Sequence, residues 1–260
     1  MKMKLLANKN AVIIGAKGGV GQEITRQFKQ HGAKVFLSDI HVEGTKEKVE
    51  LGEIRQLDSL NEDALKGYFD WFDEENVTID ILINCSGANP ASHQHGKPAT
   101  EVSYEDFMSP LKSSLASHFL SAKYAYPVMK KQGSGTIIFI TSTLAHVGCP
   151  WSPALSATHA GAEGLMKSLA NEWGPDGIRV LGVRSEAMLD TPTIDYTYRA
   201  MGANIGLNYD QMKEFVANKT SLKKLTNSSE LADVVAFAGS DMASYMTGTM
   251  LNHSGGHILN

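Results

Sequence analysis

Short β-rich segments alternate with helical patterns along almost the whole chain, and this alternation limits the fold more than any other feature. After the first segment, Val20, Ile24 and Phe28 recur every four residues and Gly32 follows them, which predicts an amphipathic helix with a glycine stop. Strands joined by helices in this way form βαβ units and a mostly parallel sheet. The predicted strands are Asn10–Gly15, Lys34–Asp39, Glu53–Leu57, Ile79–Asn84, Thr136–Thr141, Ile178–Val183 and Thr249–Asn252.

Four further helices are predicted later in the chain. They cover Tyr104–Lys131, Pro153–Trp173, Tyr209–Ala217 and Asn227–Gly239, and the last opens with the capping pattern Asn227-x-x-Glu230. No linker rich in Pro, Gly or Ser, no repeat and no low-complexity segment divides the chain. We therefore expect one α/β domain over residues 1–260.

The composition excludes several classes of protein. The chain has a formal net charge of −4, and its 24 Lys and Arg residues are scattered and outnumbered by 28 Asp and Glu residues. We therefore expect no nucleic-acid or anionic-lipid partner. No apolar run approaches the roughly 20 residues that cross a bilayer, and none resembles a signal peptide. With Cys85 and Cys149 as its only cysteines, the chain has no disulfide framework and is expected in the cytoplasm.

Two irregular segments, 88–103 and 186–208, each follow a predicted strand and are expected at the carboxyl edge of the sheet. Ligands of open α/β sheets bind at this edge. Loops of this length are uncommon in a compact domain unless they cover a site. We therefore expect both segments to be substrate loops.

A glycine cluster, Gly15-Ala-Lys-Gly-Gly19-Val-Gly21, follows the first strand and opens the first helix. Backbone N–H groups at such a position cradle a phosphate, and glycine lets the chain turn tightly and approach a pyrophosphate. A glycine cluster alone also fits a simple strand-to-helix turn. Asp39 ends the second strand, 24 positions after Gly15, and favours the dinucleotide interpretation because an acidic residue at this distance can accept hydrogen bonds from the adenosine ribose.

Asp39 also predicts which nicotinamide cofactor binds. Its carboxylate would repel a 2′-phosphate, so NAD(H) is favoured over NADP(H). Lys17 is the opposing observation, because a cation in the glycine loop could meet a 2′-phosphate. Asp39 carries more weight, since it stands at the ribose position whereas a loop lysine is more often solvated.

Further motifs follow the glycine cluster in order: Asp39, Asp58, Asn84-Cys-Ser-Gly87, Ser142 and Thr247-Gly-x-x-x-Asn252-x-x-Gly-Gly256. With Gly15-x-x-x-Gly19-x-Gly21, they resemble the short-chain dehydrogenase/reductase family. The resemblance implies a three-layer, doubly wound Rossmann-type fold with a mostly parallel sheet of seven strands. It also implies hydride transfer with a small-molecule alcohol or carbonyl, in a homodimer or homotetramer. The cofactor-binding residues that it implies are Gly15, Lys17, Gly19, Val20, Gly21, Asp39, Asp58, Asn84, Ser86, Gly87 and Thr191.

The catalytic part of this resemblance is altered. The family uses an Asn, a Ser, and a Tyr and Lys four residues apart, of which the Tyr is the general acid/base and the Lys lowers its pKa. Ser142 matches the Ser. The segment from Pro153 to Gly161 has Leu155 at the Tyr position and His159 at the Lys position, and Ser114 stands at the Asn position. A leucine neither donates nor accepts a proton, so the family's usual proton transfer is unavailable.

We take Ser142, His159 and Ser114 as the candidate catalytic residues. His159 has two interpretations of equal weight. It bonds the ribose or acts through water on a substrate, or it is a partly buried helix histidine without a chemical role. The pair His93-x-His95 is too weak a pattern for a metal site, and we expect none.

Three functions remain open. The first is an NAD(H)-binding oxidoreductase with altered catalytic residues, which the intact cofactor motifs favour. The second is a catalytically silent NAD(H)-binding partner or sensor, which Leu155 favours. The third is a lyase, isomerase or cyclase that uses the pocket without redox chemistry.

Overall fold

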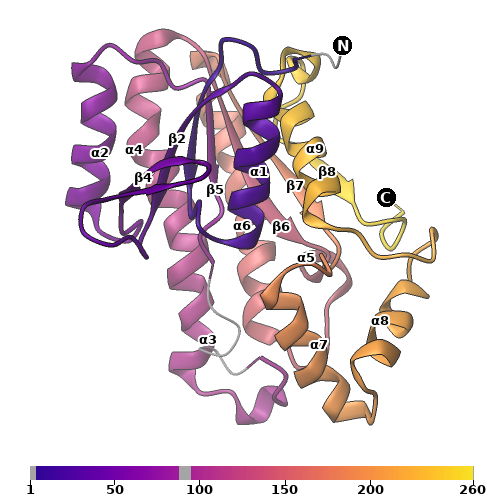
Figure 1. Cartoon of the computed structure of the whole chain (residues 1–260). Helices are drawn as coiled ribbons and strands as arrows, with labels where there is room; N and C mark the ends of the chain where they lie inside the picture. Colours follow the sequence, from indigo (N-terminus) through magenta and orange to yellow (C-terminus); the bar gives the residue numbers. More distant parts are fainter. Residues whose placement is uncertain (1–3, 88–94, 260) are drawn as a thin grey trace.

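A sheet of eight strands runs through the centre of the computed structural model, which describes residues 4–87 and 95–259 (Figure 1). The strands are β1 (Asn10–Ile14), β2 (Lys34–Asp39), β3 (Lys46–Val49), β4 (Gly52–Gln56), β5 (Ile81–Asn84), β6 (Gly135–Ser142), β7 (Ile178–Ser185) and β8 (Met250–His253). Their order is β3-β4-β2-β1-β5-β6-β7-β8. The direction of the order reverses between β1 and β5, and such a reversal marks the carboxyl edge at which sheets of this kind bind ligands.

The seven predicted strands are all present and parallel, which confirms the predicted α/β fold. The expectation of seven strands was wrong by one, because β3 is added at the edge and pairs antiparallel with β4. Its sequence is Lys-Glu-Lys-Val, with alternating exposed and half-buried residues. Charged residues commonly protect an edge strand from further pairing, and here they also leave no apolar run by which to predict the strand.

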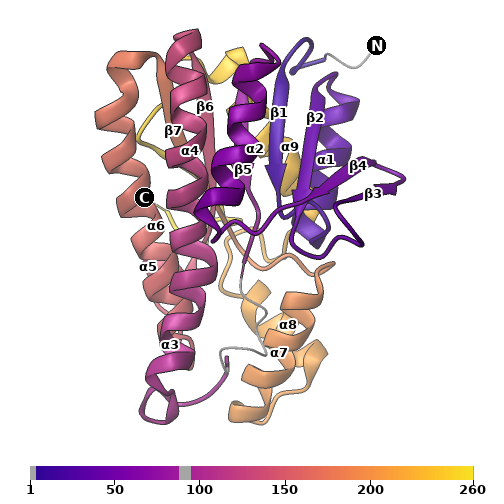
Figure 2. The same cartoon turned by 90° about the vertical axis from the view of Figure 1, so that its left-hand side faces the viewer.

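Helices cover both faces of the sheet, so the chain forms three layers (Figure 2). They are α1 (Gly19–Gln30), α2 (Glu62–Glu74), α3 (Tyr104–Pro110), α4 (Ser117–Gln132), α5 (Leu144–Val147), α6 (Pro153–Trp173), α7 (Pro192–Ile205), α8 (Tyr209–Ala217) and α9 (Ser228–Gly239). Helices α1 and α9 share one apolar core with Ile13 of β1, and α2, α4 and α6 share the other with Val12. The alternating side chains of β1 thus serve both cores. The predicted capping box of Asn227 and Glu230 opens α9.

The predicted helix over Tyr104–Lys131 is interrupted. Helix α3 ends at Pro110, and a π-helical turn, η3 (Leu111–Ala116), connects it to α4. Proline has no N–H with which to continue the hydrogen-bond ladder of the helix, which accounts for the irregular turn at this place. The side chains at the start of α4 are positioned by this turn.

The expectation of a loop over 186–208 was also wrong in part, because α7 occupies most of it. Pro192 stands at the first helical position, where a missing N–H costs nothing and the fixed φ favours a helix. Ile194, Tyr198 and Met201 recur at helical spacing and pack with α8. The segment therefore covers the carboxyl edge as a helix.

A buried ion pair ties α6 to the sheet. Arg184 of β7 donates from Nε to Glu163 Oε1 at 2.7 Å and from Nη2 to Oε2 at 2.5 Å. Its Nη1 donates to Asn252 Oδ1 of β8 at 2.7 Å. Arg184 and Glu163 are only 7% and 9% exposed. Each buried charge is stabilised by its partner, because little water reaches either side chain.

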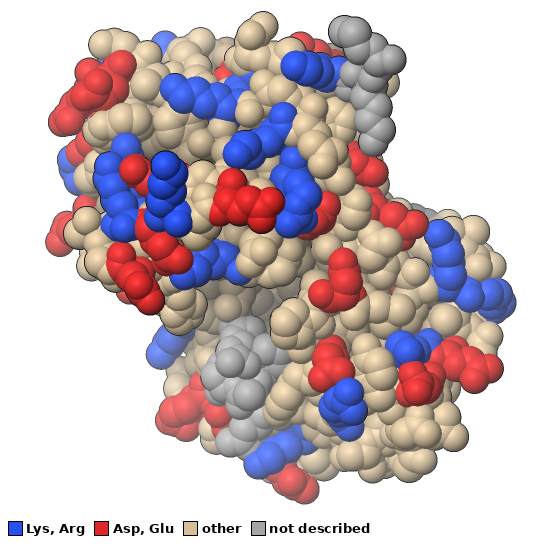
Figure 3. Space-filling view, in the orientation of Figure 1, with Lys and Arg blue, Asp and Glu red and all other residues tan. Residues whose placement is uncertain are grey.

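Acidic and basic side chains are interspersed over the face shown in Figure 3. Among the described residues, Lys66 pairs with Asp70 and Lys123 with Glu62 at the surface. Across residues 4–87 and 95–259, we find no helix long and apolar enough to cross a bilayer.

Replacing Arg184 by Met is expected to lower the free energy of unfolding by about 3–5 kcal/mol, because it leaves the Glu163 carboxylate buried without its cation. Glu163→Leu should cost a similar amount. The double variant should recover most of the loss, since two apolar side chains then replace the ion pair. Urea unfolding measures all three.

The exposed pair of Lys66 and Asp70 provides the control. Lys66→Met should leave the unfolding midpoint unchanged, because exposed pairs contribute little. If the losses of the two single variants simply add in the double variant, Arg184 and Glu163 are not coupled.

Candidate functional site

The turn between β1 and α1 leaves no room for a side chain at Gly15 or Gly21. A Cβ on Gly21 would lie 2.2 Å from the Gly15 carbonyl oxygen, and a Cβ on Gly15, whose φ is +77°, would lie 2.8 Å from the Ser86 nitrogen. No side chain caps α1, and its first turn carries no acidic residue. The N–H groups of Gly19, Val20 and Gly21 therefore lie at the open, positive end of the helix dipole, which suits a phosphate.

Asp39, at the end of β2, borders this turn. Its Oδ2 accepts the Lys17 N–H at 2.9 Å and its Oδ1 accepts the His41 N–H at 2.9 Å, which fixes the buried carboxylate. Each oxygen keeps a lone pair for another donor. The Lys17 ammonium pairs with Glu47 of β3 at 2.7 Å, and this hydrogen bond lowers the pKa of Glu47. Lys17 of the glycine turn is thus ion-paired with a residue of β3, the edge strand that the sequence did not predict.

A polar network behind β5 supports the other side of the turn. The buried Asn84 accepts the Ser86 N–H at 2.8 Å and donates to Ser117 Oγ at 2.6 Å and Ser121 Oγ at 2.9 Å. Ser117 in turn donates to Ser59 Oγ at 2.7 Å. These bonds join β5, α4 and the segment after β4. They fix the backbone at Ser86, which faces the glycine turn.

Two other expected cofactor residues lie at the ends of the same strands. Asp58 follows β4, is half-buried, and accepts the Leu60 N–H at 2.9 Å. Gly87 follows β5, is exposed, and has open space around its Cα. The structure therefore brings the ends of β1, β2, β4 and β5 to one edge.

The N-terminus of α7 reaches the glycine turn. A Cβ on Gly19 would lie 3.6 Å from Thr191 Cγ2, an ordinary contact distance, and Thr191 Oγ1 donates to the Met188 carbonyl at 2.9 Å. Helices α7 and α8 project past the carboxyl edge and hold a small apolar cluster of their own (Figure 1). Tyr198 lies buried in this cluster, and its hydroxyl finds no partner among the described residues. Burial raises the Tyr198 pKa, so the phenol stays protonated.

The candidate catalytic residues lie near the carboxyl end of β6. Ser142 ends this strand, and its Oγ accepts the Leu144 N–H at 3.3 Å. Leu155 and His159 are half-buried one turn apart on α6. In the described part of the chain, no hydrogen bond joins Ser142 to His159. The site therefore supplies a hydroxyl, an imidazole and an aliphatic side chain.

Ser114 meets a histidine that the sequence analysis missed. His118 Nδ1 lies 2.7 Å from the Ser114 carbonyl oxygen, and since a carbonyl only accepts, we assign the proton to Nδ1. The His118 ring packs edge-on against Phe139 of β6, with centroids 5.0 Å apart. His118 could have been identified from the sequence as a polar residue four positions after Ser114 on the buried side of a predicted helix.

Burial makes both imidazoles weak bases. It lowers the pKa of His118. Burial, together with the nearby His118 ring, lowers the pKa of His159 to about 4. Both rings are therefore neutral at pH 7, because the charged form of a group that loses its water is disfavoured.

Glu186, directly after β7, is a second group that the sequence analysis did not assign to the site. Its Oε2 accepts His257 Nδ1–H at 2.6 Å and the hydroxyl of Thr143, the neighbour of Ser142, at 3.2 Å. Glu186 also lines a cavity of about 600 Å³ between the end of β8, residues 221–226 and the start of α9. Glu186 could have been identified from the sequence as a carboxyl group shortly after a predicted strand.

Only part of the histidine pattern in the first loop segment lies within the described residues. His93 lies outside the described residues, as does the part of that segment from 88 to 94. His95 is buried, with its Nδ1 3.2 Å from Ser152 Oγ. The described residues contain no group of three or more side chains that could hold a metal.

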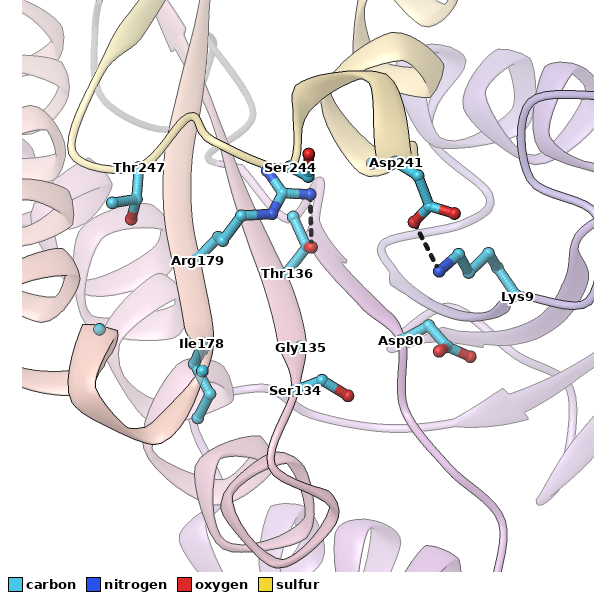
Figure 4. Close-up of a pocket in the computed structure, with 13 residues that line it drawn as sticks. Lys9, Asp80, Ser134, Gly135, Thr136, Ile178, Arg179, Asp241, Ser244 and Thr247 are labelled. Carbon is cyan, nitrogen blue, oxygen red and sulfur yellow. Dashed lines mark hydrogen bonds and ion pairs between the residues drawn. The ribbon is translucent and has the colours of Figure 1, made fainter.

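Another cavity, of about 370 Å³, lies at the opposite, amino edge of the sheet (Figure 4). There Arg179 donates to Thr136 Oγ1 at 2.8 Å and to three backbone carbonyls. Lys9 pairs with Asp241 at 2.9 Å. Since these cations are already satisfied within the protein, we regard the cavity as structural and place the candidate site at the carboxyl edge.

Solved structures share this architecture. Sorbitol-6-phosphate 2-dehydrogenase from Erwinia amylovora matches with a TM-score of 0.87 and 24% identity, covering 96% of this chain and all of the other. The aldohexose dehydrogenase of Thermoplasma acidophilum matches with a TM-score of 0.84 and 24% identity, covering 98% and 96%. At these identities the likeness establishes the fold.

Sequence comparison reaches the family. An uncharacterized oxidoreductase of Bacillus subtilis (strain 168) is 30% identical over 261 residues, which cover 98% of this chain and 92% of the relative. The 7α-hydroxysteroid dehydrogenase of Escherichia coli (strain K12) is 27% identical over 262 residues, covering 97% and 95%. The family model described as enoyl-(acyl carrier protein) reductase matches residues 15–257. With its fold, its glycine turn and these matches, the chain belongs to the short-chain dehydrogenase/reductase family of oxidoreductases.

Proposed function

We propose that the chain binds NAD(H) and oxidises or reduces an alcohol or carbonyl group of a small molecule. The observation that carries this proposal is the glycine turn, which excludes a Cβ at Gly15 and Gly21 and is bordered by the fixed carboxylate of Asp39. The nicotinamide, when bound, accepts or supplies the hydride. The protein contributes the binding surface, the polarising hydroxyl and the route of the proton.

The residues at the carboxyl edge fit such a cofactor. The N–H groups from Gly19 to Gly21 would hold the pyrophosphate, and Asp39 would accept the ribose hydroxyls. Asp58 would lie near the adenine and Thr191 near the nicotinamide amide. The pairing of Lys17 with Glu47 supports NAD(H) over NADP(H), because it engages the cation that could have met a 2′-phosphate.

The chain's own proton chemistry differs from that of its family. Ser142 can polarise the substrate oxygen, but Leu155 carries no proton. His159 is neutral at pH 7 and can accept the proton of an alcohol, directly or through water. The loss of a well-placed general acid/base typically costs about 10²–10⁴-fold in rate, so we expect slow turnover in the direction of alcohol oxidation.

A catalytically silent NAD(H)-binding protein is the second candidate. Leu155 favours it, because an aliphatic side chain stands at the position of the family's general acid/base. In this case the protein binds NADH but exchanges no hydride with any substrate.

We also propose self-association through α4 and α6. Ala157, Ala160 and Gly164 form an exposed row of small residues on α6, and Phe119 of α4 is 42% exposed. Small side chains allow two helices to approach closely. The mass of the protein in solution, measured by light scattering, tests for a dimer or tetramer.

Asp39→Asn is expected to weaken NADH binding about tenfold or more, because hydrogen bonds from the ribose to a charged acceptor are lost. NADPH binding should fall less or improve, since the repulsion of a 2′-phosphate disappears. Fluorescence titration with Trp71, Trp151 and Trp173 as reporters measures both affinities. Unchanged NADH affinity would overturn the assignment of Asp39 to the ribose.

The pair of Lys17 and Glu47 gives a matched comparison for this titration. Glu47→Gln frees the ammonium and should improve NADPH binding while NADH binding stays unchanged. Glu53→Gln removes the partner of Lys46 on the same hairpin and should change neither affinity.

The rate of alcohol oxidation is expected to stay nearly constant between pH 6 and 9. The His159 pKa of about 4 keeps the accepting form dominant throughout this range, and Leu155 adds no titrating phenol. The rate should fall only as the pH approaches 4, where protonation removes the lone pair. Initial rates with NAD⁺ and a panel of alcohols measure this profile.

Ser142→Ala should reduce that rate by about 10²-fold, the usual effect of removing one donor to a reacting oxygen, while NADH binding persists. A rate that climbs tenfold across the same pH range would reveal a different base. NADH binding without any exchange would favour the silent protein.

A further inference from the structure

Thr143 stands at the N-cap position of α5 without capping this helix. A threonine at such a position commonly accepts an N–H group from the first helical turn. Here its side chain makes no capping bond, and its hydroxyl instead donates to Glu186 Oε2 at 3.2 Å. The first N–H of α5, that of Leu144, is bonded by Ser142 Oγ at 3.3 Å. Two neighbouring hydroxyl groups therefore have different partners, and Glu186 accepts one of them.

This arrangement leaves the hydroxyl proton of Ser142 free. A hydroxyl group has one proton to donate and two lone pairs that accept. The Leu144 N–H occupies one lone pair, and no acceptor within residues 4–87 and 95–259 receives a hydrogen bond from the Ser142 O–H. The proton is thus available to a substrate oxygen, which is the donation that the proposed function requires of Ser142.

Glu186 is held by donors at both oxygens of its carboxylate. Its Oε1 accepts the Ala187 N–H at 3.1 Å, and its Oε2 accepts the Thr143 hydroxyl together with His257 Nδ1–H at 2.6 Å. Its own N–H donates to the His253 carbonyl at 3.1 Å, which fixes the backbone to the end of β8. Glu186 and Thr143 are 8% and 2% exposed. Since the carboxylate is buried, it depends on these donors in place of water.

His257 is the donor that comes from farthest along the chain. It lies in the segment after β8, 71 positions from Glu186, and its Nδ1 makes the shortest of the hydrogen bonds to this carboxylate. Since a carboxylate oxygen only accepts, we assign a proton to Nδ1. The C-terminal segment therefore fixes the acceptor of the Thr143 hydroxyl.

We propose that Glu186 and His257 are positioning residues for Ser142. Glu186 binds the Thr143 hydroxyl and so keeps it away from α5, and His257 holds the carboxylate in the place where it does so. Without either group, the Thr143 side chain is free to cap α5, and the turn from Ser142 to Leu144 then changes. The inference rests on the proposed function, because it assumes that Ser142 donates to the substrate oxygen.

Amide exchange of the Leu144 N–H in the nucleotide-free full chain tests the positioning directly. Ser142→Ala, which lacks the Oγ acceptor, gives the exchange rate of the broken contact. We expect Glu186→Leu and Thr143→Val to raise the Leu144 rate about tenfold, toward that reference, because the turn loses its bond to the end of β7. The rate at the fully buried Ile138 of β6 should stay unchanged. An unchanged Leu144 rate in either variant would overturn the proposal.

His257 allows a matched pair of substitutions. An asparagine amide nitrogen takes nearly the place of Nδ1, so His257→Asn keeps the donor to Glu186, whereas His257→Leu removes it. We expect the Leu144 exchange rate to rise in His257→Leu and to stay within about twofold of the unsubstituted protein in His257→Asn. His253→Leu is the control, because the His253 ring bonds Thr226 at 2.6 Å. Equal rates in the two His257 variants, or a similar rise in His253→Leu, would overturn the role of His257.

Initial rates with NAD⁺ and a panel of alcohols give the second readout. We expect kcat to fall about tenfold in Glu186→Leu and in Thr143→Val at similar KM, because the substrate still binds while its donor is misaligned. The double variant should fall no further than either single variant, since both substitutions break the same contact. Losses that multiply in the double variant would contradict a shared effect on Ser142.

Titration with NADH separates this inference from the proposed function. NADH affinity in Glu186→Leu should stay within about twofold of that of the unsubstituted protein, because the glycine turn and Asp39 are unaltered. A loss of affinity and kcat together would indicate a damaged fold and would count against positioning. If no sample binds NADH, the proposed function fails, and the Leu144 exchange rates still decide whether Glu186 and His257 hold the turn at Ser142.

Discussion

The bidentate ion pair of Arg184 and Glu163 is the interaction on which the arrangement of the site depends. It joins α6 to β7, and through Asn252 it reaches β8. Glu163 lies one turn after His159, so the pair determines how α6 rests on the sheet and where the His159 side chain stands. A buried ion pair adds less to net stability than its hydrogen bonds suggest, but it admits few alternative packings of the helix.

The two halves of the site are chemically different. On the cofactor side, backbone N–H groups, the Asp39 carboxylate and the Asn84 network present fixed polar groups at the ends of neighbouring strands. On the side of proton transfer, Leu155 is inert and burial keeps His118 and His159 uncharged. Desolvation disfavours the charged form of both imidazoles, so each accepts a proton only weakly. Under the proposed function, the chain would thus combine a nucleotide-binding turn with a weakly basic proton acceptor.

Two separate parts of the chain enclose the carboxyl edge. Helices α7 and α8 hold their own apolar cluster beyond the sheet, and Thr191 at the start of α7 lies beside Gly19 of the glycine turn. From the other side, His257 bonds Glu186, which also holds Thr143 beside Ser142. The C-terminal segment is therefore linked through Glu186 to the end of β6. The resemblance of the chain to its family did not predict the polar side chains of Glu186 and His257 at this place.

Local pattern in the sequence determined the seven parallel strands, the glycine turn, the capping box of α9 and the presence of Leu155 and His159 on one helix. Each of these features depends on neighbours within a few residues, so spacing and residue type were sufficient. Local pattern did not predict three features: the charged strand β3, the π-helical turn before α4 and the full extent of α7. Only the tertiary structure decided that Lys17 pairs with Glu47, that His118 turns to Ser114 and that Glu186 meets His257. The first and last pairs span 30 and 71 positions, and the second depends on a helix irregularity, so burial and packing select these contacts and no local periodicity encodes them.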